Sequence, residues 1–83
     1  MGAEAATNII AREIIKALSE ELGVPLTKIT QETLLIEDLG IDSFRAVELM
    51  FLIKEAFDIE YSPEDFRKAR KVKDIVAYVA SKQ

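Results

Sequence analysis

The residues best suited to chemistry lie in one short stretch, Asp38-Leu39-Gly40-Ile41-Asp42-Ser43-Phe44. It places the hydroxyl of Ser43 after a glycine turn and beside acidic side chains. Asp42 and Ser43 are both helix-capping residue types, and an amphipathic segment follows them. A hydroxyl at a helix start is exposed, and the free N–H groups there favour an attached phosphate by about 0.3–1 kcal/mol. The local pattern also fits a residue that merely caps the helix.

Composition excludes several other kinds of chemistry. The chain has 83 residues and contains neither cysteine nor histidine. Disulfides, thiolate or imidazole metal ligands, and Ser-His-Asp or Cys-His catalysis are therefore impossible. A carboxylate-based enzyme is a poor alternative, because the acids lie along a helix without sign of a water-excluding pocket. No stretch approaches the roughly 20 apolar residues of a membrane span, and the N-terminus lacks a secretory signal, so we expect a free-standing cytoplasmic monomer.

The net charge of −4 is unevenly distributed. Residues 37–60 carry seven acids and two bases, whereas residues 61–83 carry three acids and six bases. Nucleic acid is not expected as a partner, because phosphate binding requires a basic surface. An acidic middle and a basic end instead predict two surfaces with different partners.

Apolar residues at helical spacing predict four helices, over residues 9–22, 43–57, 62–68 and 72–82. We expect Thr7 or Asn8 to cap the first helix and Gly23 to end it, with residues 1–6 as a disordered tail. The apolar face of the second helix is expected to comprise Phe44, Val47, Met50, Phe51, Ala56 and Phe57, widened by Leu49 and Ile53.

Residues 24–42 show no regular period but contain seven leucine and isoleucine side chains. Because burying one aliphatic side chain contributes about 1.5–3 kcal/mol, three or four would hold this loop in place. We therefore predict a single all-α domain: a small bundle of three main helices plus one short helix, with a long structured loop after the first.

The stretch 37–43, followed by Val47-Glu48-Leu49, resembles the signature of acyl carrier proteins. Further similar positions are Leu22-Gly23-Val24, Ile29, Thr30, Phe57, Val72 and Tyr78, so the resemblance covers about residues 7–82. It implies that a phosphopantetheinyl transferase esterifies Ser43, beside Asp42, with 4′-phosphopantetheine from coenzyme A. The thiol of this arm would hold an acyl group as a thioester, which fits the absence of cysteine. The protein would present substrates and would not be an enzyme.

The resemblance also implies surfaces for partner enzymes and for the acyl chain. Acidic residues would steer the domain transiently to basic patches on acyl-transferring and acyl-modifying enzymes of fatty acid, polyketide or related biosynthesis. These residues are Glu37, Asp38, Asp42, Glu48, Glu55, Asp58 and Glu60. The candidate acyl pocket is lined by Phe44, Val47, Phe51, Phe66 and Ala69, for which an ordinary packed core is the alternative.

Three features depart from the family pattern. Phe44 replaces the usual leucine, Arg45 places a positive charge two residues after the serine, and residues 67–73 contain five bases. We hypothesise a specialised carrier whose partners differ from the general fatty-acid enzymes, with Arg45, Arg67, Arg70 and Lys71 in partner binding. These bases could instead only reduce the self-repulsion of an acidic domain. The alternative function is an unmodified helical interaction module, and the acyl cargo is left open.

Overall fold

The computed structural model describes residues 2–83, with side chains from residue 7 onward. This part of the chain forms α1 (Gly2–Leu22), η1 (Leu26–Lys28), α2 (Ser43–Phe57), α3 (Pro63–Arg67) and α4 (Val72–Lys82). Within the same range there is no strand, only an isolated bridge between Leu34 and Lys71. None of the described helices is long and apolar enough to cross a bilayer. The predicted all-α class is confirmed.

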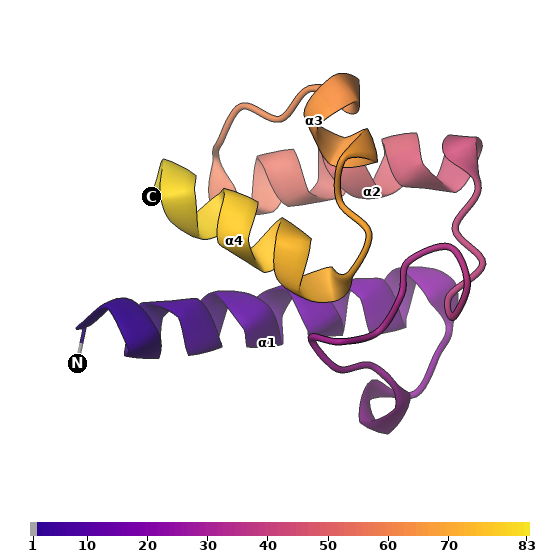
Figure 1. Cartoon of the computed structure of the whole chain (residues 1–83), viewed down its shortest axis with the longest axis horizontal. Helices are drawn as coiled ribbons and strands as arrows, with labels where there is room; N and C mark the ends of the chain where they lie inside the picture. The colour runs from indigo at the N-terminus through magenta and orange to yellow at the C-terminus, as the bar shows by residue number, and fades with distance from the viewer. Residues whose placement is uncertain (1) are drawn as a thin grey trace.

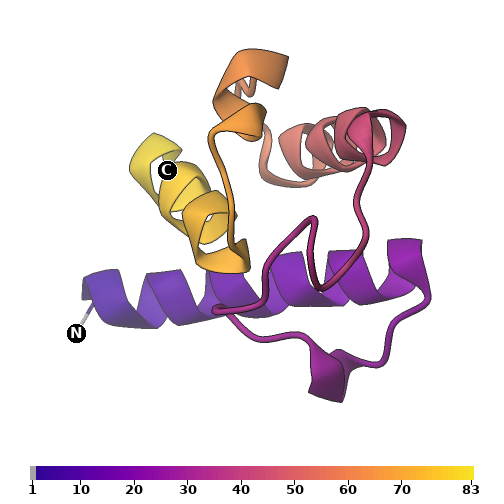
Figure 2. The ribbon, with the colours of Figure 1, turned by 45° about the vertical axis from the view of Figure 1, so that its right-hand side comes forward.

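The helices form a small bundle around a shared interior. Figure 1 shows α1 along one side and α2 running back in the opposite direction. The turned view in Figure 2 shows the loop after α1 passing below that helix before it returns to the start of α2. Helix α1 packs mainly against α4 and also against α2, while the short α3 packs against α2.

The first helix begins earlier than its apolar stripe. Helix α1 starts at Gly2, so the predicted start at residue 9 and the cap at Thr7 or Asn8 were wrong. Alanine and glutamate, which dominate residues 3–6, are strong helix formers and continue the helix without an apolar stripe. Met1 lies outside the described residues. Residues 2–6, which were predicted to belong to a disordered tail, are part of α1.

The first helix ends as predicted at Gly23, which adopts a left-handed conformation with φ 69°. Its N–H donates to the carbonyl of Ser19 at 2.8 Å. The Ser19 hydroxyl in turn donates to the carbonyl of Val24 at 2.6 Å, which fixes the direction in which the loop leaves the helix.

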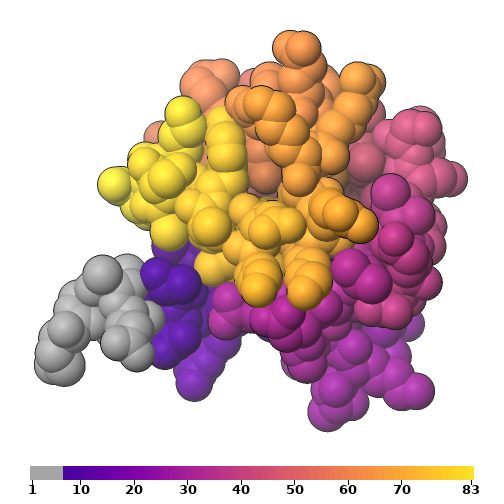
Figure 3. Space-filling view, viewed as in Figure 1, coloured from indigo at the N-terminus to yellow at the C-terminus, as the bar shows by residue number. Residues whose placement is uncertain are grey.

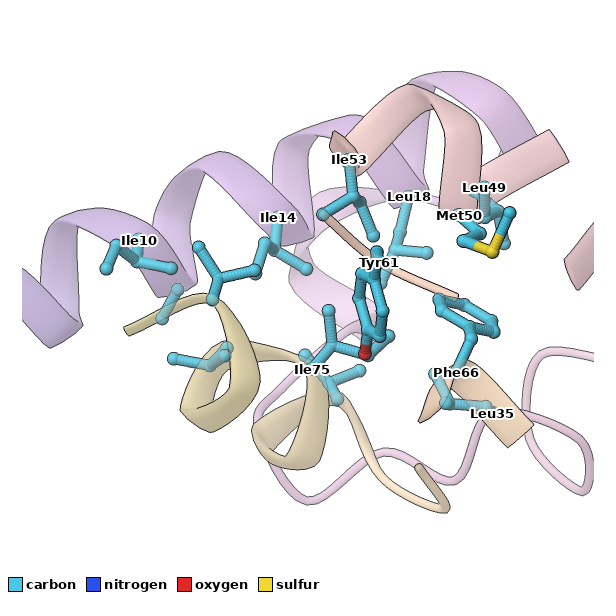
Figure 4. Close-up of a cluster of buried hydrophobic side chains, with 14 of the residues drawn as sticks. Ile10, Ile14, Leu18, Leu35, Leu49, Met50, Ile53, Tyr61, Phe66 and Ile75 are labelled. Carbon is cyan, nitrogen blue, oxygen red and sulfur yellow. The ribbon is translucent and has the colours of Figure 1, made fainter. Parts of the chain in front are cut away.

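The core combines all four helices with the long loop, as Figure 4 shows. Helix α4 contributes a continuous buried stripe of Val72, Ile75, Val76 and Val79. The loop contributes Ile29, Leu35 and Ile41, each no more than 5% exposed. Two other loop aliphatics, Leu26 and Ile36, stay exposed. The predicted anchoring of the loop by three or four aliphatic side chains is confirmed.

Only part of the predicted apolar face of α2 is buried. Leu49, Met50 and Ile53 are buried, whereas Phe44, Val47 and Phe51 are 73%, 42% and 53% exposed. The helix carries two adjacent apolar arcs, and only the arc that faces the rest of the bundle enters the core. We call the exposed arc, Phe44, Val47 and Phe51, the α2 stripe.

An aromatic cluster connects α3 and α4. The rings of Tyr61 and Tyr78 stack with centroids 4.0 Å apart, and Phe66 meets Tyr61 edge-on at 5.3 Å. The Tyr78 hydroxyl donates to the Glu60 carbonyl at 3.1 Å and lies 3.3 Å from Oδ2 of Asp65. These contacts hold α3, and with it Phe66, in place against the bundle.

The two arcs of α2 should respond differently to truncation. Leu49→Ala should lower the free energy of unfolding by about 2–5 kcal/mol, because it leaves a cavity in the core. Phe51→Ala should change it by less than about 1 kcal/mol, since that ring is half exposed. Chemical denaturation of the two variants compares these losses, and equal losses would contradict the assignment of the buried face.

Candidate functional site

The turn before α2 places Ser43 at the helix start. Gly40 has φ 65°, a conformation that favours glycine, and its N–H donates to the carbonyl of Ile36 at 2.9 Å. Asp42 is the N-cap: its Oδ1 accepts from the N–H of Arg45 at 2.8 Å. Ser43 is then the first residue of the helix and is exposed. Because Asp42 performs the capping, the Ser43 hydroxyl is not needed for it.

Ser43 opens onto a hollow between α2 and α3. This α2–α3 hollow has a volume of about 80 Å³ and is lined by Ser43, Ala46, Val47, Met50, Pro63, Phe66 and Arg67. A wider outer hollow of about 430 Å³ shares Ser43, Ala46, Phe66 and Arg67 and adds Asp42, Ala69 and loop aliphatics. Most of these side chains are apolar, so the two hollows form a mainly apolar recess that starts at the serine.

The predicted pocket residues fall in different places. Val47 and Phe66 line the α2–α3 hollow, and Ala69 lines the outer hollow. Phe44 and Phe51 lie on the exposed α2 stripe and line neither.

Sequence reasoning missed four residues of the α2–α3 hollow, Ala46, Met50, Pro63 and Arg67. Ala46 and Met50 follow Ser43 by three and seven positions, and this spacing places all three on one helix face. That signal was available in the sequence. Pro63 and Arg67 reach the hollow only because α3 packs against α2.

Ala69, which lines the outer hollow, lies in the segment between α3 and α4, and this segment is hydrogen-bonded to the long loop. The N–H of Leu35 donates to the carbonyl of Arg70 at 2.9 Å, and that of Val72 donates to the carbonyl of Thr33 at 3.0 Å. In Figure 3 the orange and yellow atoms of this segment and of α4 lie directly against the magenta atoms of the loop.

Asp74 holds the same segment from the other side. Its Oδ2 accepts from the N–H groups of Arg70 at 2.9 Å and of Lys71 at 3.0 Å. These backbone hydrogen bonds hold the pKa of the Asp74 carboxyl below its usual range.

Ion pairs within the chain neutralise much of the predicted basic patch. Nζ of Lys71 lies 2.9 Å from Glu32 Oε1, and Nζ of Lys73 lies 3.3 Å from Glu32 Oε2. The hydrogen bond from Lys71, followed by that from Lys73, lowers the pKa of Glu32. Lys68 lies 3.9 Å from Asp65. Among the ion pairs of residues 7–83, none involves Arg67 or Arg70.

Several predicted partner-binding residues on the α2 side also have partners within the chain. NH1 of Arg45 lies 3.6 Å from Glu21 and 3.5 Å from Glu48. Oδ2 of Asp38 accepts from the N–H of Leu34 at 2.9 Å. Glu37, Glu55 and Asp58 are exposed and absent from the ion pairs of residues 7–83, so these three remain the most available acids of the predicted surface.

The chain is similar to known proteins over most of its length. Residues 12–79 match the family described as phosphopantetheine attachment site. An acyl carrier protein of Akkermansia muciniphila is 40% identical over 76 residues, which cover 92% of this chain and 95% of the relative. One from Syntrophobacter fumaroxidans is 43% identical over 68 residues, covering 82% and 84%. The solved acyl carrier protein of Enterococcus faecalis shares the fold, with a TM-score of 0.78 over 93% of this chain and 98% of its own, at 23% identity.

The family match and the two curated relatives together identify a phosphopantetheine-dependent carrier. The chain belongs to the acyl carrier protein family. It is a carrier with a covalently attached 4′-phosphopantetheine and not an enzyme, since acyl carrier proteins do not themselves catalyse reactions. The unmodified interaction module is not favoured.

Removing the negative charge of Asp74 should destabilise the segment between α3 and α4. Asp74→Asn should lower the free energy of unfolding by about 1 kcal/mol at pH 7, because two N–H groups lose a charged acceptor. The folded-state pKa is depressed, so this stabilisation is complete well above about pH 4 and is lost as the pH falls through the folded value. The pKa of Glu32 is also lowered, so Glu32 adds to the pH dependence of stability in both the wild type and Asp74→Asn. Its effect therefore cancels when the free energies of unfolding of the two proteins are subtracted.

Denaturation curves from pH 7 down to pH 2.5 measure this difference. The difference in the free energy of unfolding between the wild type and Asp74→Asn should become smaller toward acid pH. Glu55→Gln, which neutralises an exposed acid on α2, serves as the control. A gap that is constant with pH, or an equal loss in the control, would contradict the role of Asp74.

Proposed function

We propose that Ser43 is the attachment residue and that the chain carries acyl groups as thioesters on the arm, delivering them to partner enzymes. The observation that carries this assignment is the position of Ser43, exposed at the start of α2 and at the mouth of the recess. The bound arm supplies the thiol that the chain lacks.

The chain's own residues fit such a group. The exposed hydroxyl is accessible to a transferase, and Asp42 rather than Ser43 caps the helix, so esterification leaves the cap intact. The start of α2 favours a nearby negative charge. Ala46, Val47, Met50 and Phe66 offer apolar walls along which part of an acyl chain can be held away from water.

The proposal includes partners and a location. The partners are a phosphopantetheinyl transferase and acyl-transferring or acyl-modifying enzymes, met through transient contacts of a monomer. The arm comes from coenzyme A, which is a cytoplasmic cofactor, so we propose the cytoplasm as the location of the protein. Fatty acid biosynthesis is the usual role of such homologues, and polyketide or related pathways are the other possibilities.

Docking is proposed to use the exposed side of α2. The α2 stripe supplies apolar contact area, and Glu37, Glu48 and Glu55 supply negative charge beside it. The Arg45 guanidinium lies within 3.6 Å of both Glu21 and Glu48 and reduces the negative charge of this side. This combination supports a specialised carrier that general enzymes with basic docking surfaces recognise less well.

Attachment at Ser43 predicts a single mass increase. Incubation with coenzyme A and a broad-specificity phosphopantetheinyl transferase should add one arm to the wild type, measured by intact-protein mass spectrometry. Ser43→Ala should add none. Ser62→Ala is a matched control, because Ser62 is also an exposed serine at a helix start, where its hydroxyl caps α3. Addition to Ser43→Ala, or none to the wild type, would refute the assignment.

The charge of Arg45 predicts a difference in partner recognition. Arg45→Ala frees Glu48 and Glu21, so acylation by a general fatty-acid synthase component should become about two- to fivefold more efficient at low salt. The measurement is kcat/KM for the holo-protein, repeated at high salt, where the gain should disappear. Lys28→Ala, which removes an exposed base of η1, is the control. No gain, or the same gain in the control, would contradict the hypothesis.

A further inference from the structure

Arg67 differs from the other bases of the 67–73 segment in its place and in its pairing. It ends α3 and lines both the α2–α3 hollow and the outer hollow, together with Ser43. Lys68, Lys71 and Lys73 all have acidic partners within the chain. In the described part of the chain, Arg67 takes part in no ion pair, so its charge is available to a ligand.

The charges around the outer hollow indicate which kind of ligand Arg67 would bind. Asp42 and Arg67 both line that hollow, and Ser43 lies beside them. An anionic group attached through Ser43 therefore starts next to a carboxylate, which repels it. A guanidinium on the same hollow offsets that repulsion and can bind two oxygens of one phosphate or carboxylate at once.

The surroundings of Arg67 strengthen such a contact. Arg67 is exposed, but Ala46, Val47, Met50 and Phe66 give the α2–α3 hollow apolar walls, which limit the water on one side of an ion pair formed at its edge. An ion pair with less water around it is screened less than one on an open surface. The long apolar stem of arginine can lie along these walls while its charged end faces the opening.

We infer that Arg67 is a binding residue for an anionic oxygen group carried on Ser43. The group is either the phosphodiester of the arm or a carboxylate at the free end of a short acyl group. This inference rests on the attachment to Ser43 proposed above. If the bound anion is a carboxylate of the cargo, the cargo is a dicarboxylic acyl group. If it is the phosphodiester, Arg67 positions the arm whatever cargo the arm carries.

Arg70 provides a matched control. It is also an arginine of the same segment, is exposed, and is absent from the ion pairs of residues 7–83. Unlike Arg67, it lines neither hollow. Arg67→Gln and Arg70→Gln therefore remove the same charge and differ in their position relative to the hollows.

The experiment compares the wild type, Arg67→Gln and Arg70→Gln in four forms. These are the unmodified protein, the protein with the bare arm, the protein with an acetyl-loaded arm and the protein with a malonyl-loaded arm. Mass spectrometry first confirms loading, and failure to load the wild type overturns the proposed attachment and this inference together. In loaded protein, NMR should show solvent exchange of the Arg67 Nε–H slowed about two- to fivefold relative to the unmodified form. The Arg70 Nε–H should not change.

The pattern across the forms identifies the source of the anion. Slowing in all three modified forms supports the phosphodiester, and slowing only in the malonyl form supports a cargo carboxylate. The thermal midpoint is then compared before and after modification, in the form that shows the slowing. Its rise on modification should be smaller for Arg67→Gln than for Arg70→Gln. Arg67→Lys should restore part of this rise, because lysine keeps the positive charge. Full loading with identical behaviour of Arg67 and Arg70 in every form would overturn the inference and leave the attachment intact.

Discussion

The burial of three loop side chains is the constraint on which the rest of the site depends. Ile29, Leu35 and Ile41 enter the core and hold a long loop that otherwise lacks regular structure. At about 1.5–3 kcal/mol for each fully buried aliphatic, this is enough to order the chain that leads into α2. Backbone hydrogen bonds to the segment between α3 and α4 add to it. The same anchoring therefore sets the position of Ser43 and the wall of the recess beside it.

Pairing within the chain changes what its charges present to other molecules. Glu32 neutralises two lysines, and Arg45 lies between two glutamates. A segment with five bases thus presents mainly the charges of Arg67 and Arg70. The α2 side likewise presents less negative charge than its composition indicates, next to an apolar stripe of Phe44, Val47 and Phe51. Both effects support the proposal that this carrier is recognised by selected partners and not by every enzyme with a basic docking surface.

A carrier needs no catalytic side chains of its own, but it needs a serine that is exposed and a core that this exposure does not disturb. Under the proposed attachment at Ser43, the hydroxyl must be accessible to a separate enzyme, while the core beneath it must stay intact after modification. The structure separates these demands, because Asp42 caps the helix and Leu49, Met50 and Ile53 fill the core, leaving Ser43 outside both tasks. The hollows beside Ser43 are small and mainly apolar, which suits transient shelter of part of a cargo.

The sequence by itself determined the helical class, the bounds of α2 and α4, the end of α1 at Gly23 and the helix-start serine. These features follow from local patterns, since periodicity, capping residues and glycine act within a few neighbouring residues. Only the tertiary structure decided which apolar arc of α2 is buried, that Lys71 and Lys73 pair with Glu32, and that Arg67 and Pro63 share a hollow with Ser43. Those outcomes depend on contacts between segments far apart in the chain, and no local spacing encodes which of two similar faces meets the core.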